Sequence, residues 1–231
     1  MAYAFVASVS AGSSDAVSVT TGTVDTTGAN LLVVVVATDS ASSNATISDS
    51  KGNTWTAATF YDDATSTRVR ISYCFGGTVG TGHTFTATHA SAPRPSIAML
   101  AFSGAVTAPF GNENGAGSPG VTSKQPGSIT PPENNCLVVS GLSFNATNSP
   151  TQDAGMTEQE SVAWVSNQCR GLRAAYKIQT TAAAINPTWS WSTSCDCATD
   201  IASFKAAAAG GTNAGVKRLI GGSRLLSGLT A

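Results

Sequence analysis

The feature that most constrains the fold of this chain is a short run of branched apolar residues that occurs twice. The first copy is Asn30-Leu31-Leu32-Val33-Val34-Val35-Val36-Ala37, and a weaker copy, Asn135-Cys136-Leu137-Val138-Val139-Ser140-Gly141-Leu142, follows about one hundred residues later. Runs of this kind, bounded by polar turn formers and far too short to cross a bilayer, are typical of central buried strands. Two such runs predict two cores.

Other blocks recur in the same order. Leu32-Val33-Val34 matches Leu137-Val138-Val139 at an offset of 105, and Arg70, Tyr73 and Phe75 recur at an offset of 103 as Arg173, Tyr176 and Ile178. Thr84-Phe85 recurs as Thr188-Trp189, and Ile97-Ala98 as Ile201-Ala202, both at an offset of 104. An internal duplication accounts for these matches. The alternative is one large sandwich whose halves look alike because all its strands look alike.

The composition favours β structure. Only 11% of the 231 residues are charged, so few Glu and Lys residues are present to solvate helix faces. Each copy holds short alternating stretches separated by turn signals, the pattern of an antiparallel sandwich. We therefore predict an all-β chain of two tandem antiparallel β-sandwich domains, jelly-roll or immunoglobulin-like, at residues 1–107 and 108–208. The Gly- and Pro-containing residues 104–120 are expected to form a linker or long connection.

The charge distribution separates the C-terminus from the rest. The whole chain has a net charge of −1, which gives no electrostatic case for binding nucleic acid or an acidic membrane surface. Residues 201–231 carry four basic residues and no acid, whereas the preceding residues are net −5. The N-terminus lacks the basic and apolar regions of a secretory signal, so we expect synthesis in the cytoplasm.

Residues 209–231 form a Gly-, Leu- and Arg-containing tail outside the repeat. Arg218-Leu219-Ile220-Gly221-Gly222-Ser223 is echoed by Arg224-Leu225-Leu226-Ser227-Gly228, a spacing that fits neither helix nor strand. We expect this extended tail to dock on another subunit. The docking residues would be Lys217, Arg218, Leu219, Ile220, Arg224, Leu225, Leu226 and Leu229.

Residues able to carry catalysis are few. His83 and His89 lie outside any triad or metal-binding motif, and we expect surface or turn histidines. Glu158 and Glu160 would share a strand face, but a solvated face is favoured over a glycosidase pair. Asp49, Asp62 and Asp63 are read as turn residues rather than calcium ligands. We expect no enzyme activity, no cofactor and no metal.

The cysteines leave three alternatives open. Cys195 and Cys197 lie on one face of an extended segment, too constrained to bridge each other, and one of them could pair with Cys169 or Cys136. A Cys-x-Cys spacing lacks the usual zinc knuckle, and Cys74 leaves the total odd. Three alternatives remain. In order of preference they are free thiols, at least one disulfide, and a metal site.

Trp189 and Trp191 fall on one face of a strand, as rings of a sugar-stacking platform sometimes do. Their counterparts in the first copy, Phe85 and Ala87, are apolar, which favours a place in the core. Glycan stacking on these rings, or on Tyr61, is the alternative.

The motifs resemble those of jelly-roll-like or immunoglobulin-like domains of tailed-bacteriophage virion proteins. The resemblance rests on four segments. They are the Leu-Val run, Asp49-Ser50-Lys51-Gly52-Asn53-Thr54-Trp55, Gly82-His83-Thr84-Phe85-Thr86, and Ser96-Ile97-Ala98 through Phe102-Ser103-Gly104. The second copy lacks the Asp-Ser-x-Gly-Asn-Thr-Trp turn.

The resemblance implies a non-enzymatic virion component, such as a capsid decoration, head-fibre or tail-associated protein. Its partners would be other virion subunits, as a homo-oligomer or with a capsid or tail protein. A carbohydrate-binding module for host-surface glycans, or a glycan depolymerase, are the alternatives.

Overall fold

The computed structural model describes residues 2–39, 44–90 and 94–208. These residues form strands, turns and loops and no helix, so no helix among them is long and apolar enough to span a membrane. The all-β prediction is confirmed for this part of the chain. The strands are β1 (Ala4–Gly12), β2 (Ser18–Thr20), β3 (Leu31–Thr38), β4 (Thr46–Asp49), β5 (Thr56–Asp62), β6 (Arg68–Phe75), β7 (Phe85–Thr88), β8 (Ser96–Ser103), β9 (Ala105–Lys124), β10 (Cys136–Phe144), β11 (Thr151–Gln152), β12 (Thr157–Val162), β13 (Gly171–Gln179) and β14 (Trp189–Ala206).

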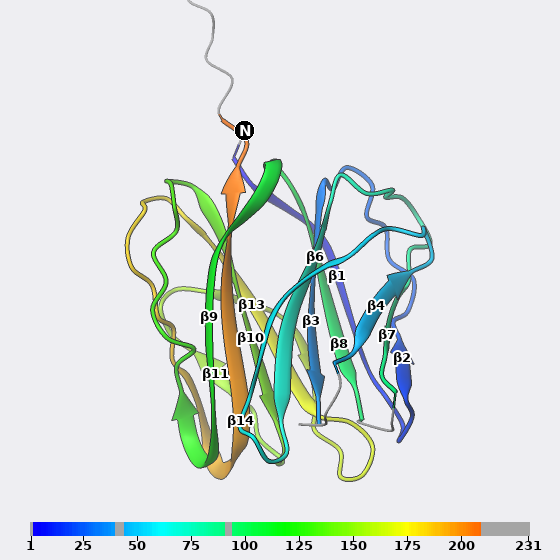
Figure 1. The fold of residues 1–231 in the computed structure, drawn as a ribbon, viewed down its shortest axis with the longest axis vertical. Helices are drawn as coiled ribbons and strands as arrows, with labels where there is room; N and C mark the ends of the chain where they lie inside the picture. The colour runs from blue at the N-terminus through cyan, green and yellow to red at the C-terminus, as the bar shows by residue number, and fades with distance from the viewer. Residues whose placement is uncertain (1, 40–43, 91–93, 209–231) are drawn as a thin grey trace, which may run out of the picture.

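The two large antiparallel sheets have the same strand order (Figure 1). The first is β1-β8-β3-β6-β5; the second reads β9-β14-β10-β13-β12, with β11 also pairing with β14. Each strand of the first sheet therefore has its counterpart in the same position of the second, which is the arrangement expected of a duplicated unit. A third sheet, β2-β7-β4, covers the outer side of the first.

The repeated apolar runs become the central strands β3 and β10. Every residue of both strands is buried, so the prediction of two central buried strands is confirmed. Residues of β3 alternate between two cores, because successive side chains of a strand point to opposite faces. Leu31, Val33 and Val35 face the second sheet, and Leu32, Val34 and Val36 face the small sheet.

The pairing register places the correspondence between β3 and β10 at 106 positions rather than 105. Leu31 lies opposite Phe102, and Leu137 lies opposite Phe204. Likewise Leu31 pairs with Phe75, and Leu137 with Ile178. The sequence match at 105 is therefore off by one residue in this strand, and one residue of slip exchanges the two faces of a strand. Similar apolar residues on both faces of a buried strand hide that slip in the sequence.

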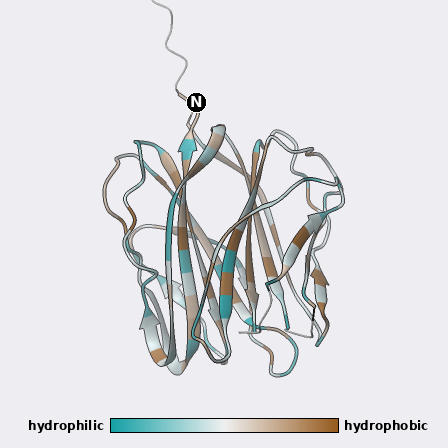
Figure 2. Cartoon of the chain, viewed as in Figure 1, coloured by the Kyte–Doolittle hydropathy of each residue, from teal (hydrophilic) through white to brown (hydrophobic). Residues whose placement is uncertain are grey.

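The largest core lies between the two large sheets and belongs to both repeats. It combines Val33 and Ile71 of the first repeat with Val139, Leu172 and other residues of the second. Each repeat also has smaller cores on its outer side, one under β2-β7-β4 and two on the outer face of the second sheet. Hydrophobic residues, brown in Figure 2, accordingly run along strands throughout the body. The expected division into domains at residues 107 and 108 stays a prediction, because the central interior is common to both.

The stretch 104–120 is not a linker. Most of it lies in β9, which pairs with β14 along the edge of the second sheet. Its glycines allow β9 to approach the first repeat closely: a Cβ on Gly115 would lie 2.2 Å from the ring of Tyr61, and one on Gly117 2.1 Å from the Asp62 carbonyl oxygen. These glycines contributed to the expectation of a linker. In the structure they permit close packing between the repeats.

Two equivalent clusters of three aromatic rings join the large sheets. In each cluster a Phe on the edge strand and a Phe on its neighbour belong to one repeat, and the Tyr that completes it belongs to the other. The edge Phe stacks on the Tyr, with ring centroids 5.6 Å apart in one cluster and 5.3 Å in the other and an interplanar angle of 8° in both. The clusters are Phe5, Phe102 and Tyr176, and Phe110, Phe204 and Tyr73. Exchange of the two repeats converts one cluster into the other.

Candidate functional site

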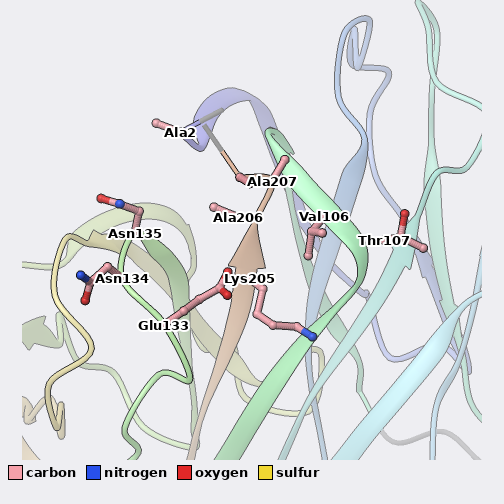
Figure 3. Close-up of a pocket in the computed structure, with 10 residues that line it drawn as sticks. Ala2, Val106, Thr107, Glu133, Asn134, Asn135, Lys205, Ala206 and Ala207 are labelled. Carbon is pink, nitrogen blue, oxygen red and sulfur yellow. The ribbon is translucent and has the colours of Figure 1, made fainter. Parts of the chain in front are cut away.

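A hollow of about 570 Å³ lies at the end of the body where the chain starts and where β14 finishes (Figure 3). Its volume falls within the range of small-molecule sites, about 300 to 1,000 Å³. One acid and one base face it, Glu133 from the loop before β10 and Lys205 from β14. The other residues that line it are small or polar: Ala2, Val106, Thr107, Asn134, Asn135, Ala206, Ala207 and Ala208.

The backbone around this hollow is firmly held. The Tyr3 hydroxyl donates to the Lys205 carbonyl oxygen at 2.8 Å, and the Ala207 N–H donates to the Gly104 carbonyl oxygen at 2.7 Å. The side chain of Asn30 donates to the Ala105 carbonyl oxygen and accepts from its N–H, at 2.9 and 3.1 Å. Burial raises the pKa of Tyr3, so the hydroxyl stays a donor. These bonds fix the point from which residues 209–231 continue.

A second cluster of polar side chains is buried beneath the small sheet. The Asp49 carboxylate accepts from Trp55 Nε1 at 2.7 Å and from the Lys51 N–H at 2.8 Å, and its Oδ1 lies 3.1 Å from His83 Nε2. The other ring nitrogen of His83 is 2.9 Å from the Thr26 hydroxyl. The turn motif at 49–55 and His83, separate in the sequence, therefore form one network.

The Asp49, His83 and Thr26 side chains form a chain of contacts like that of a hydrolase triad, but their placement is structural. His83 and Thr26 have no exposed surface, and the Thr26 hydroxyl is also bonded to the backbone of Gly80. A substrate has no route to such a hydroxyl. Burial raises the pKa of Asp49, but the hydrogen bonds from Trp55, Lys51 and Asn53, together with the close contact of His83, outweigh it and hold the pKa below its ordinary value. The network therefore fixes the turn against β7.

Both histidines differ from expectation. We expected surface or turn positions, yet His83 and His89 are buried. His83 packs against Phe85 with ring centroids 4.2 Å apart, and this contact places it in the core of the first repeat.

Two polar clusters tie the repeats together at their rims. Asp196 of β14 accepts from Ser66 at 2.7 Å, from Asn145 at 3.0 Å and from the Gly120 N–H at 3.0 Å. At another rim Asp39 of the first repeat forms an ion pair with Arg170 of the second. Ser96 also donates to the Arg170 carbonyl oxygen at 2.5 Å. These side chains stabilise the contact between repeats.

The two candidate glycan-stacking rings are core residues. Trp189 is 0% and Trp191 8% exposed, and their ring N–H groups donate to the Ser140 hydroxyl at 3.1 Å and to the Val121 carbonyl oxygen at 2.9 Å. Burial to this extent favours the core placement over glycan stacking for this pair. Tyr61, the third candidate, packs partly against the shared core.

All five cysteines are free and buried, so the candidate disulfide among Cys136, Cys169, Cys195 and Cys197 is not formed. Burial raises the pKa of Cys197 to about 12 and also raises that of Cys195, which leaves these thiols protonated and poorly reactive. Within residues 2–39, 44–90 and 94–208, no group of three or more His, Cys, Asp or Glu side chains is placed to hold a metal ion.

The carboxylates considered at the outset do not form a pair. A bulge in β12 sets Glu158 opposite Ala175 and Glu160 opposite Ala174, which face opposite sides of the sheet, so the two do not share a face. Glu158 instead lies 3.2 Å from Arg173. Asp62 binds Arg68 at 2.7 Å, and Asp63 accepts the backbone N–H groups of its own turn at residues 65–67, as expected of turn residues.

The docking residues of the tail, Lys217 to Leu229, lie outside the described residues.

The sequence analysis missed Asp200, a fully buried acid on the inner face of β14. The signal for it was present, because Asp200 interrupts an otherwise uncharged strand segment, Ala198 to Phe204. It also missed Gly141, whose role depends on the opposite sheet.

Comparison with known proteins yields no match: no family model, no curated protein and no solved structure is similar to this chain.

Proposed function

We propose that the protein is a non-enzymatic structural subunit that a C-terminal peptide anchors to a larger assembly, specifically a phage virion. Capsid decoration, head fibre and tail-associated protein are the placements in view. The observation that carries the proposal is the fixed exit of the chain: β14 ends beside Ala2, held by Tyr3 and Gly104, at one end of the body (Figure 1). A tail leaving from a rigid point presents the whole body in one orientation.

The charge and apolar content of the tail support the same proposal. Residues 201–231 are net +4 and contain Leu219, Ile220, Leu225, Leu226 and Leu229, whereas the preceding residues are net −5. Each apolar side chain would contribute about 1.5 to 3 kcal/mol on full burial against a partner. Arg218 and Arg224 would pair with carboxylates or backbone carbonyls.

The hollow beside Glu133 and Lys205 lies next to the start of this tail. A partner segment that accompanies the tail would meet it first, and the asparagines there offer donors and acceptors to a peptide backbone. The body would then serve as the outward-facing, decorating part of the assembly.

Removal of residues 212–231 tests the proposal. The truncated chain is expected to keep the unfolding midpoint of the full chain but to lose incorporation into particles, measured by co-sedimentation with virions produced in its presence. A full-length variant with Leu219, Ile220, Leu225, Leu226 and Leu229 replaced by Ser separates apolar docking from charge, and it should fail like the deletion. Incorporation of the truncated chain at the full-length level would rule out the anchoring role.

A further inference from the structure

Asp200 lies in the shared core at a point where the two repeats differ. By the pairing of the central strands, Val35, Ala98 and Ile71 of the first repeat correspond to Gly141, Asp200 and Ala174 of the second. The first repeat therefore carries a methyl group where the second carries a carboxyl. An acid at such a position needs a specific account, because burial of an unpaired charge is strongly unfavourable.

Among the described residues, only one of the two oxygens of Asp200 has a hydrogen-bond partner. Oδ1 accepts from the Gly141 N–H at 3.0 Å, while Oδ2 is buried and no donor in this part of the chain meets hydrogen-bond geometry with it. Opposite lies the first sheet: a Cβ on Gly141 would stand 2.4 Å from Val35 Cγ1, 2.6 Å from Asp200 Oδ1 and 3.3 Å from Val69 Cγ2. The absent side chain of residue 141 thus lets Val35 approach, and the carboxyl is enclosed between the sheets.

We propose that Asp200 is a proton-sensitive contact between the two repeats, accommodated in the shared core when neutral and loosening the packing of the two large sheets when charged. The charged form would place an anion among Val35, Val69 and Ile71. The proposal concerns the body alone and does not depend on the role proposed for the tail.

The groups that face Asp200 do not supply a compensating cation. From β9 comes Glu113, itself an acid, and from β5 comes Tyr61. Arg70 of β6 interacts with Glu113, and its guanidinium Nε donates to the Ala58 carbonyl oxygen at 2.8 Å. The strands β3 and β10 contribute Val35 and Gly141, which do not titrate.

The pKa of Asp200 is raised to about 7. Burial is the largest cause and the Glu113 carboxylate adds to it, while the backbone N–H groups of Gly141 and Ile71 lower the pKa by less. The carboxyl of an unfolded chain titrates at about 3.9. Between these two values the folded state holds a proton that the unfolded state has lost, so stability falls as the pH rises from about 4 to about 7 and is level above that.

The test is urea unfolding of the full chain at pH 5, 6, 7 and 8, with Asp200→Asn as the variant that keeps the shape but cannot ionise. The ratio of folded to unfolded wild-type protein, relative to D200N, should fall about tenfold between pH 5 and 6 and about fivefold between pH 6 and 7. Asp25→Asn is the surface control. The pKa of Asp25 is lowered by its bonds to Thr27, so this change should alter the profile only below about pH 4. A D200N profile with the wild-type decline between pH 5 and 7 would overturn the proposal.

Infrared spectroscopy provides a readout that does not require D200N to fold. Glu158 is the other carboxyl whose pKa burial raises, so Glu158→Gln removes its signal. In this background a protonated carboxylic acid band should be present at pH 6, where ordinary carboxyls are ionised, and absent at pH 9. The amides of Gly141 and Ile71 should exchange hydrogen faster at pH 9 after correction for the intrinsic rate. Absence of the acid band at pH 6, or unchanged protection of both amides, would contradict the proposal.

Discussion

Phe5 of β1 stacks on Tyr176 of β13, with ring centroids 5.6 Å apart and planes inclined by 8°. The two residues belong to different repeats, and Phe110 and Tyr73 repeat the contact in the opposite sense. A contact made twice with the roles exchanged implies that the two large sheets face each other about an approximate two-fold axis. The two sheets, which share one strand order, therefore pack against each other as the two subunits of a symmetric dimer do.

The symmetry of the aromatic clusters predicts equal effects of equivalent changes. Tyr176→Ala and Tyr73→Ala should each lower the free energy of unfolding by about 2 to 4 kcal/mol, because each removes a ring packed on two others. Urea unfolding measures both. Val17→Ala, at a side chain that is 45% exposed, serves as the control and should change stability by less than about 1 kcal/mol. A loss confined to one of the two tyrosines would contradict the symmetric packing.

Gly141→Ala is expected to be strongly destabilising. The added Cβ would overlap Val35 and Asp200, and overpacking of a core typically costs about 1 to 3 kcal/mol. Gly22→Ala is the matched control, since no atom lies within 4 Å of a Cβ there, and its unfolding midpoint should stay near that of the wild type. An unchanged midpoint for Gly141→Ala would show that the two sheets are not so closely apposed.

Removal of Asp49 should loosen the turn at 49–55. Asp49→Ala leaves Trp55 Nε1 and the Lys51 N–H without their acceptor, at about 1 to 3 kcal/mol for each donor left buried. Tryptophan fluorescence should report a more exposed Trp55. Asp25→Ala, at an exposed acid that bonds only to Thr27, is the control.

The same residue predicts acid sensitivity. Because the folded pKa of Asp49 lies below its ordinary value, its contribution to stability is present above about pH 4 and lost as the pH falls through the folded pKa. Asp49→Asn should therefore show a smaller loss of stability between pH 4 and pH 2.5 than the wild type. An identical loss in both proteins would exclude Asp49 as a source of that sensitivity.

Separation of the repeats should expose the shared core. Residues 1–104 expressed alone would present Val33, Val35, Ile71 and Leu100 to solvent, and we expect self-association or aggregation in size-exclusion chromatography. Co-expression with residues 105–208 should restore a soluble complex, because the two fragments carry complementary faces. A monomeric, cooperatively unfolding 1–104 fragment would instead establish the independent domains that the sequence predicts.

The all-β class and the two central buried strands could be predicted from the sequence, and so could the order in which similar blocks recur. Alternating and fully apolar runs such as Leu31 to Ala37 are local signals, and the recurrence of Arg70, Tyr73 and Phe75 as Arg173, Tyr176 and Ile178 needs no knowledge of what they contact. Turn residues such as Asp63 were likewise predictable, because their hydrogen bonds are to neighbours in the chain.

Which surfaces of those strands meet could not be predicted from the sequence. The union of the cores, the burial of His83, the β9 strand in place of a linker, and the enclosure of Asp200 all depend on contacts between segments far apart in the chain. Glycines illustrate the reason: Gly115 lies in a stretch predicted to be a linker, and neither it nor Gly141 indicates in the sequence that Tyr61 or Val35 lies opposite. The pattern of apolar residues in a sequence indicates which side chains are buried, but it does not indicate which distant segment of the chain packs against them.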